Sequence, residues 1–134
     1  MANKDYSTTI KDYIATINFC SKELDVKQRI AFKDVSDCIS LDEATQQDAV
    51  IINVDYYGKV DIHNEKSDNK DYSKYIIADK DGQRYVTGSE SFWRSLTEIA
   101  DEVTDAGLPD WAIRVFRRPS KNYKGKDFIT CSII

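Results

Sequence analysis

The sequence has few of the residues that build metal sites, disulfide frameworks or flexible linkers. Its 134 residues include one histidine, three cysteines, two prolines and five glycines. Cys20, Cys38 and Cys131 are far apart and form no Cys-x-x-Cys pair. Neither a zinc site nor a disulfide framework is expected from this spacing, and each cysteine is interpreted as a small buried side chain. We predict no metal and no other cofactor.

Motifs of catalysis are also missing. The chain has no Gly-x-x-x-x-Gly-Lys-Ser/Thr loop, no Gly-x-Ser-x-Gly elbow, and no histidine beside a plausible nucleophile. Asp55, Asp61 and Glu65 are carboxylates that a metal could use, but no companion motif accompanies them, so solvated charges are the favoured interpretation. We predict that the protein is not an enzyme and assign no catalytic residue.

No apolar run approaches the length that a bilayer requires. The segment Met1 to Asp5 lacks the apolar core of a signal peptide, so we expect a reducing compartment, the cytoplasm. The chain is 41% hydrophobic and large enough for one core, which indicates a single soluble domain spanning residues 1–134.

The N-terminal third gives the weaker structural signals. Residues 7–20 carry apolar side chains at spacings of three, four and seven, which predicts a short amphipathic helix capped by Ser7, Thr8 or Thr9. The apolar residues are Ile10, Tyr13, Ile14 and Ile17. Ser21 to Arg29 is polar and is predicted to be a linker or ragged helix end, so residues 1–29 form a helical extension. A first strand is expected between Ile30 and Leu41.

From Val50 onward the strand signals are clear. Val50 to Ile62 alternates in hydrophobicity and predicts a long strand, with Gly58 on its inward face where the strand can bend. A charged loop covers residues 64–71. Tyr72 to Ala78 and Gln83 to Thr87 flank an Asp-Gly pair, which predicts a hairpin.

The last third predicts one helix and two strands. Ser89 is a suitable N-cap, and an apolar stripe then follows at spacings of four, three and four. The helix should end near Ala106, because Gly107 favours a left-handed cap and a proline follows. Strands are expected over residues 111–117 and 127–134, joined by a basic loop.

The order strand, long bent strand, hairpin, helix, strand, strand is that of an OB-fold. We therefore predict a mainly β domain with helices, built on a five-stranded antiparallel barrel with a helix between its third and fourth strands. The N-terminal helix would be an addition to it. An unrelated α+β sandwich is the alternative.

Charge is divided unevenly along the chain. Trp111 to Ile134 hold six Lys or Arg residues against Asp127 alone, a net charge of +5. The preceding residues hold 13 Lys or Arg against 22 Asp or Glu, a net charge of -9. A basic terminal hairpin on an acidic body suggests a surface for an anionic partner.

The basic hairpin also carries aromatic residues. With a period of two, Arg114, Phe116 and Arg118 share one strand face, while Ile113 and Val115 share the other. Guanidinium groups bind phosphates and rings stack on bases, which is how single strands are held without sequence readout. We therefore predict a nucleic-acid-binding surface. Its residues are Tyr57, Arg114, Phe116, Arg118, Lys121, Tyr123, Lys124, Lys126 and Phe128.

Each part of this surface has a second interpretation. The rings of Phe116 and Phe128 could instead pack on the N-terminal helix or on a partner subunit, and the loop lysines could form a solvated turn. Tyr123, between Lys121 and Lys124, is the favoured mobile stacking residue. Tyr57 lies on the outward face of the long strand.

Three stretches resemble small single-stranded DNA-binding proteins encoded by phages and prophages of Gram-positive bacteria. They are Tyr75 to Gly82, Tyr85 to Trp93 and Arg118 to Phe128, and the resemblance covers roughly Val50 to Ile134. It implies an accessory of phage replication or recombination that coats single strands in the host cytoplasm. It also implies a homo-oligomer, with a dimer favoured, and contacts with phage replication or recombination proteins.

The resemblance has one departure. Bacterial members of the wider class end in an acidic tail that recruits partners, whereas this sequence ends Cys131-Ser132-Ile133-Ile134. Recruitment of partners through a tail is therefore not expected. The second functional hypothesis rests on the net charge of -9 before Trp111: an interaction protein whose acidic surface mimics nucleic acid or docks on a basic protein, with the hairpin serving as an oligomer interface. The choice between DNA and RNA, the site size and the oligomeric state are left open by the sequence.

Overall fold

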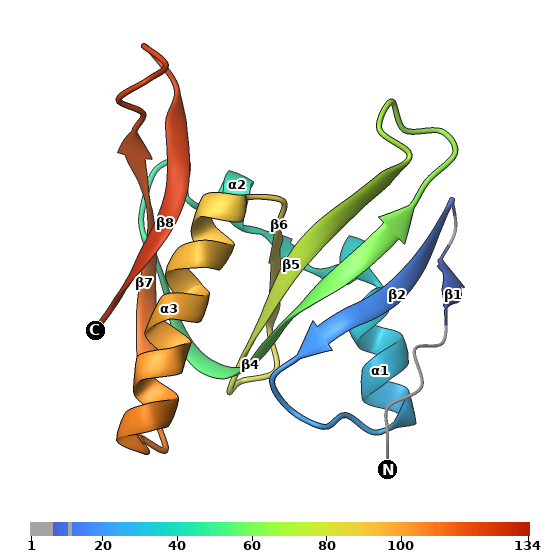
Figure 1. Cartoon of the computed structure of the whole chain (residues 1–134), viewed down its shortest axis with the longest axis horizontal. Helices are drawn as coiled ribbons and strands as arrows, with labels where there is room; N and C mark the ends of the chain where they lie inside the picture. Colours follow the sequence, from blue (N-terminus) through green and yellow to red (C-terminus); the bar gives the residue numbers. More distant parts are fainter. Residues whose placement is uncertain (1–6, 11) are drawn as a thin grey trace.

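The computed structural model describes residues 7–10 and 12–134, so the segment Met1 to Asp5 discussed above lies outside the described residues. The chain is rich in β-strands (Figure 1). In order, the elements are β1 (Thr8–Ile10), β2 (Tyr13–Cys20), α1 (Val26–Lys33), a 3-10 turn (Val35–Asp37), β3 (Ile39–Ser40), α2 (Leu41–Ala44), β4 (Val50–His63), β5 (Asp71–Asp79), β6 (Arg84–Thr87), α3 (Glu90–Ala106), β7 (Ala112–Pro119) and β8 (Asp127–Ile133). Among these residues, no helix is both long and apolar enough to cross a bilayer.

The long strand β4 organises the sheet because it has three strand partners. Its first residues, Val50 to Asn53, pair with β7, and its later residues pair with β5 on one edge and β2 on the other. The pairing is antiparallel throughout, except that β3 runs parallel to β6. In the described chain β8 pairs only with β7, so the sheet curls without closing.

The mainly β class predicted from the sequence is confirmed, but the architecture is more extended than the predicted barrel. The described residues form eight strands in place of five, and strand pairing leaves the sheet open. The predicted long strand, the β5–β6 hairpin and the two terminal strands all form, with boundaries within two residues of those expected. The strands β4 to β8 form the curled part of the sheet, a half-barrel.

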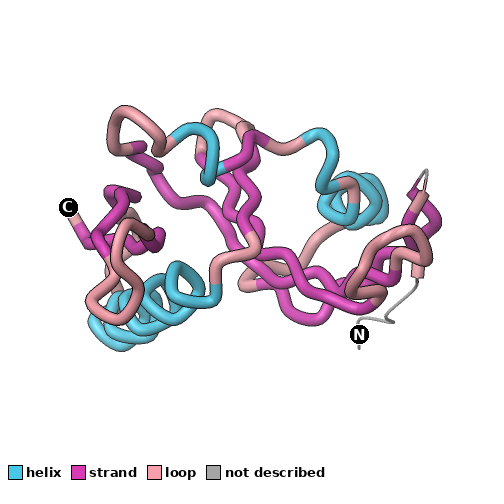
Figure 2. The backbone as a smooth tube through the Cα atoms, turned by 90° about the horizontal axis from the view of Figure 1, so that it is seen from above, coloured by secondary structure: helices cyan, strands magenta, loops and turns pink. Residues whose placement is uncertain are grey.

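Two apolar cores lie on opposite faces of the sheet, one under α3 and one under α1. Figure 2 shows these two helices on opposite sides of the strands. Phe92 and Leu96 of α3 pack with Ile52, Ile113 and Ile129 inside the half-barrel. The second core is built by Phe32 of α1 with its neighbours on the other face. Those neighbours are Ala15, Leu24, Val60, Ile62 and Ile76.

The helix α3 forms as its sequence predicts. Ser89 is its N-cap, and the Ser89 hydroxyl accepts a hydrogen bond from the backbone N–H of Phe92 at 3.2 Å. Gly107 ends the helix in the left-handed region at φ 68°. Because Phe92, Leu96 and Val103 recur on one face, that face is buried and the opposite face is exposed.

The helix predicted over residues 7–20 is wrong, because these residues form the hairpin of β1 and β2. Ala15 is completely buried and faces α1, whereas Ile14 is 42% exposed on the opposite face. A helical stripe would have buried Ile14. The pairing edge of β4, about forty residues later in the chain, satisfies the backbone of β2 and selects the strand.

The segment after β2 also differs from the expectation. The predicted linker contains the start of α1, and the strand expected between Ile30 and Leu41 is reduced to the two residues of β3. The sequence does contain a start signal for α1, although the spacing of its apolar residues does not indicate a helix. Asp25 and Gln28 form a capping box, in which each side chain bonds the backbone of the other residue.

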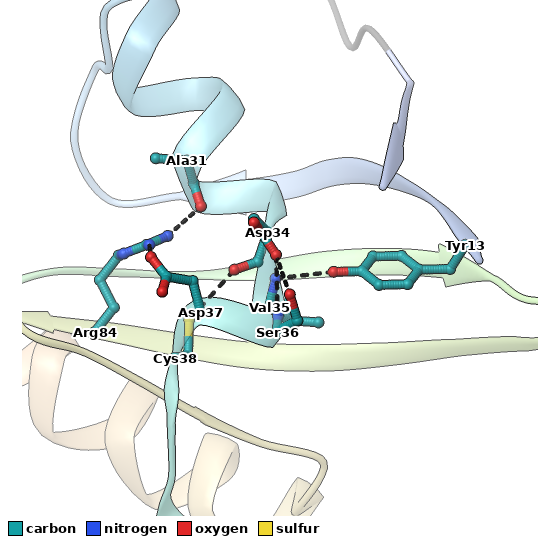
Figure 3. A network of polar contacts seen from close by, with 8 residues as sticks. All are labelled: Tyr13, Ala31, Asp34, Val35, Ser36, Asp37, Cys38 and Arg84. Atoms are coloured by element: carbon teal, nitrogen blue, oxygen red, sulfur yellow. Dashed lines mark hydrogen bonds and ion pairs between the residues drawn. The ribbon is translucent and has the colours of Figure 1, made fainter. Parts of the chain in front are cut away.

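Polar contacts attach α1 to the sheet (Figure 3). The Arg84 guanidinium donates to the carbonyl oxygen of Ala31 and forms an ion pair with Asp37 at 3.1 Å. The N–H of Val35 donates to the Tyr13 hydroxyl at 3.1 Å. These contacts attach α1 and the following turn to β2 through Tyr13 and to β6 through Arg84.

Gly58 provides the clearance that brings β2, β4 and α1 together. A Cβ atom at this position would lie 2.3 Å from the backbone oxygen of Phe19 and 2.6 Å from Cζ of Phe32. The first contact involves the backbone of a paired strand, so it cannot be relieved by a change of rotamer. The glycine predicted to ease the bend of β4 is thus required for close packing.

We expect Gly58→Ala to destabilise the protein by about 1–3 kcal/mol, the usual cost of overpacking a well-packed site. Urea denaturation monitored by circular dichroism measures this change. Gly88→Ala is the matched control, because its added Cβ would meet only the flexible end of Lys74 at 3.3 Å. Equal stability of the two variants would contradict the role assigned to Gly58.

Candidate nucleic-acid interface

The terminal hairpin β7–β8 has one buried and one open face. Ile113 and Val115 are completely buried against the core of the half-barrel. Arg114 and Arg118 are exposed on the opposite face, with Phe116 half-buried between them. The hairpin therefore presents the arrangement predicted from strand alternation. Figure 1 shows its loop projecting at the end of the β7–β8 arm.

Both arginines contact the ring of Phe116. The guanidinium carbon of Arg114 lies 4.8 Å from the ring centroid, and that of Arg118 lies 5.3 Å from it. These distances are within the range of cation–π attraction. On the neighbouring strand, Phe128 lies directly opposite Arg118 and is 36% exposed.

A hollow of about 740 Å³ opens at the tip of the hairpin. Tyr123 and Phe128 both line it and are 65% and 36% exposed. Cationic side chains surround these two rings. The hollow is lined by Ser91, Arg118, Pro119, Ser120, Lys121, Asn122, Tyr123, Lys126, Asp127 and Phe128. Five of the nine predicted site residues are therefore brought together around one opening.

The loop that carries these residues has a defined turn. The N–H of Ser120 donates to the carbonyl oxygen of Lys126 at 2.8 Å, and the N–H of Lys126 donates to that of Tyr123 at 3.2 Å. Gly125 adopts φ 78°, a conformation that glycine reaches without strain. The turn leaves the side chains of Lys121, Tyr123 and Lys124 exposed to solvent.

Among the described residues, the ion pairs of Lys and Arg with carboxylates lie in the body and none lies in the hairpin. In the body, Lys22, Lys66, Lys70, Lys80 and Arg84 all form ion pairs with carboxylates. Among the described residues, no ion pair involves a cation between positions 111 and 134. Within the described chain, the hairpin cations are therefore not engaged in ion pairs with carboxylates.

One hairpin cation points away from this surface. Arg117 is half-buried, and its Nη2 donates to the carbonyl oxygen of Asp42 in α2 at 2.5 Å. Its Nε is buried and has no hydrogen-bond partner among the described residues. Arg117 therefore links β7 to α2 across the open side of the half-barrel, so five of the six basic residues face solvent.

Tyr57 lies apart from the hairpin tip, in an aromatic cluster on the sheet. Its ring centroid is 6.0 Å from that of Phe19, 6.1 Å from that of Trp93 and 6.3 Å from that of Trp111. Trp93 in turn stacks on Tyr75 at 4.9 Å. Burial raises the pKa of the Tyr57 hydroxyl, and Asp101 adds to the effect. These contacts fit a packing role for Tyr57.

The other reactive groups lie away from the hairpin tip or are buried. Burial raises the pKa of the Cys38 thiol to about 11 and that of Cys131 to about 12, so both are protonated at neutral pH. His63 bonds Asp71 at 2.7 Å and Glu65 at 2.6 Å, and these bonds raise its pKa. Within the described residues, no group of three or more His, Cys, Asp or Glu side chains could hold a metal ion.

Sequence reasoning did not include every residue of the hollow. Ser91 reaches it from the first turn of α3, and its hydroxyl donates to the carbonyl oxygen of Ile129 in β8 at 2.8 Å. Nothing in the sequence near Ser91 indicates this proximity. The contact depends on the packing of α3 against the edge of β8, which only the folded chain provides.

No protein-family model, curated protein or solved structure matches this chain. The resemblance to phage single-stranded DNA-binding proteins therefore rests on the sequence pattern quoted above. The geometry of the hairpin must carry any functional argument.

The environments of the tyrosines predict different effects on stability. We expect Tyr57→Ala to destabilise the protein by about 2 kcal/mol, because a half-buried ring loses its aromatic neighbours. Tyr123→Ala should leave the stability unchanged, because its ring is mostly in solvent. Urea denaturation of both variants tests the assignment. A larger loss for Tyr123→Ala than for Tyr57→Ala would reverse it.

Proposed function

We propose that the β7–β8 hairpin binds single-stranded nucleic acid with little sequence specificity. The observation that carries this proposal is the grouping of unpaired cations around two exposed rings. Arg118, Lys121 and Lys126 line the hollow together with Tyr123 and Phe128. Such a surface offers phosphates a positive field and offers bases a stacking plane, the two requirements of single-strand binding.

The order of elements supports an OB-like interpretation of the half-barrel. β4, β5, β6, α3, β7 and β8 follow one another as the strands and helix of that fold do, and the remaining elements are additions. OB-folds bind ligands on the face of their second and third strands and in two loops. Here Ile76 of β5 and Val86 of β6 pack in the core under α1 and the following turn, so the loop of the β7–β8 hairpin is the favoured site.

The biological setting is proposed from the sequence resemblance alone. It suggests an accessory of phage DNA replication or recombination, acting in the host cytoplasm as a homo-oligomer. The chemistry of the hairpin suits single-stranded DNA and RNA alike, since phosphates and base faces are common to both.

A second candidate function is docking of a basic protein on the acidic face of α3. Glu98, Asp101, Glu102 and Asp105 are exposed, and the last turn of the helix contains no basic residue. Negative charge near a helix C-terminus is unfavourable to the helix, so this stripe has a cost in stability. The nucleic-acid proposal is preferred because the hairpin combines charge with stacking surfaces.

The salt dependence of the affinity for single strands should distinguish binding by the hairpin cations from binding by the cations of the body. If all five exposed hairpin cations bind phosphates, the slope of log K against log salt should be about -3.5, at roughly -0.7 per contact for single strands. We expect replacement of Arg114, Arg118, Lys121 and Lys124 by alanine to weaken binding to labelled oligo(dT) and to reduce the slope toward about -0.7. Fluorescence anisotropy titrations at several salt concentrations measure both effects.

The matched control replaces Lys22, Lys66, Lys70 and Lys80 by alanine, which removes the same charge from cations that already have carboxylate partners. This variant should retain a slope close to that of the parent. Equal losses in the two variants would mean that net charge alone governs binding. If the parent does not bind oligo(dT) even at low salt, the docking function of the acidic face is favoured.

Tyr123 provides a separate test of stacking. We expect Tyr123→Ala to weaken oligo(dT) binding by about 1–3 kcal/mol with an unchanged salt slope, because a stacked ring releases no counterions. The same titrations give the answer, with the thermal midpoint and the oligomeric state measured as controls. Binding equal to that of the parent would exclude Tyr123 as a stacking residue.

A further inference from the structure

The role of Phe116 follows from what surrounds its ring. The sequence predicts that Phe116 stacks on a base, because it lies between two arginines on the open face of β7. In the structure the guanidinium groups of Arg114 and Arg118 both lie over this ring. A base could stack there only after displacing a cation that itself binds phosphate. Phe128 and Tyr123 are more exposed than Phe116, at 36% and 65%.

Phe116 is also fixed to the framework of the hairpin. It is half-buried, and it pairs across the sheet with Thr130 of β8. The Thr130 hydroxyl in turn hydrogen-bonds that of Ser95 in α3 at 2.8 Å. The ring therefore stands on a strand position that is connected to the α3 helix, whereas the arginine side chains are exposed.

The ring brings the two charges closer than the backbone does. Arg118 is four positions after Arg114 along the strand, which corresponds to about 13 Å between their Cα atoms. The two guanidinium carbons lie 4.8 and 5.3 Å from one ring centroid, so they are at most about 10 Å apart. Without the ring, two long and flexible side chains could point away from each other.

We propose that Phe116 is a positioning residue, which holds the Arg114 and Arg118 guanidinium groups together so that they bind neighbouring phosphates of one strand. This inference rests on the proposed function. Phe116 then acts through the arginines, and the stacking is done by Phe128 and Tyr123. Loss of its ring should therefore change the electrostatic part of binding.

The test compares Phe116→Leu with Phe128→Leu in oligo(dT) titrations at several salt concentrations. Phe116→Leu should weaken binding several-fold at low salt and reduce the slope of log K against log salt by about 0.7, the loss of one phosphate contact. Phe128→Leu should weaken binding equally at every salt concentration. Phe116→Tyr keeps the ring and should restore the slope of the parent. Thermal midpoints check that each variant is folded.

Two results in these titrations would overturn the proposal. Weaker binding by Phe116→Leu at an unchanged slope would identify Phe116 as a stacking residue. Binding and slope equal to those of the parent would show that the arginines do not need the ring.

A measurement on the free protein separates this inference from the proposed function. The side-chain protons of Arg114 and Arg118 should show upfield ring-current shifts in NMR spectra, and Phe116→Leu should remove them. Absence of these shifts in the parent would overturn the positioning geometry, whatever the protein binds. Their presence without oligo(dT) binding would overturn the proposed function and, with it, the role in phosphate binding.

Discussion

The structure depends on the pairing of one strand, β4, with three others. Its first residues hold β7, and through β7 the β8 strand, while its later residues hold β5 and β2. The later part of β4 can pack closely against β2 and α1 because Gly58 has no side chain between it and the backbone of β2 or the ring of Phe32. Both cores are therefore built around β4, and the terminal hairpin is placed by it.

The fold decides which charged side chains lie next to one another. In the acidic body, Lys22, Lys66, Lys70 and Lys80 form exposed ion pairs with carboxylates, which contribute little to stability but neutralise the local field. The hairpin extends from the body at the end of β7 and β8, so its loop lysines meet no carboxylate partner among the described residues. An anionic ligand would encounter this region as a concentrated positive field.

Prediction succeeded where local signals were strong and the tertiary structure agreed with them. The Ser89 cap, the apolar stripe of α3 and Gly107 all specify one helix, and the Asp-Gly turn specifies the β5–β6 hairpin. Prediction failed for β1 and β2, because Ile10, Ile14 and Ile17 fit a helical spacing, while β2 found its pairing partner in the distant strand β4 and β1 paired with β2. A pairing edge that lies elsewhere in the sequence has no local signal.

The sequence by itself determined the basic, aromatic character of the terminal hairpin and the alternation that separates Arg114 and Phe116 from Ile113. Strand geometry alone requires this separation, because successive side chains point to opposite faces. Only the tertiary structure decided what covers each face. It turned Arg117 toward α2, placed Tyr57 among other rings, and set both arginines over Phe116. An odd or even position along a strand assigns a side chain to one face of the sheet. The residues that the side chain contacts on that face come from elements far away in the chain.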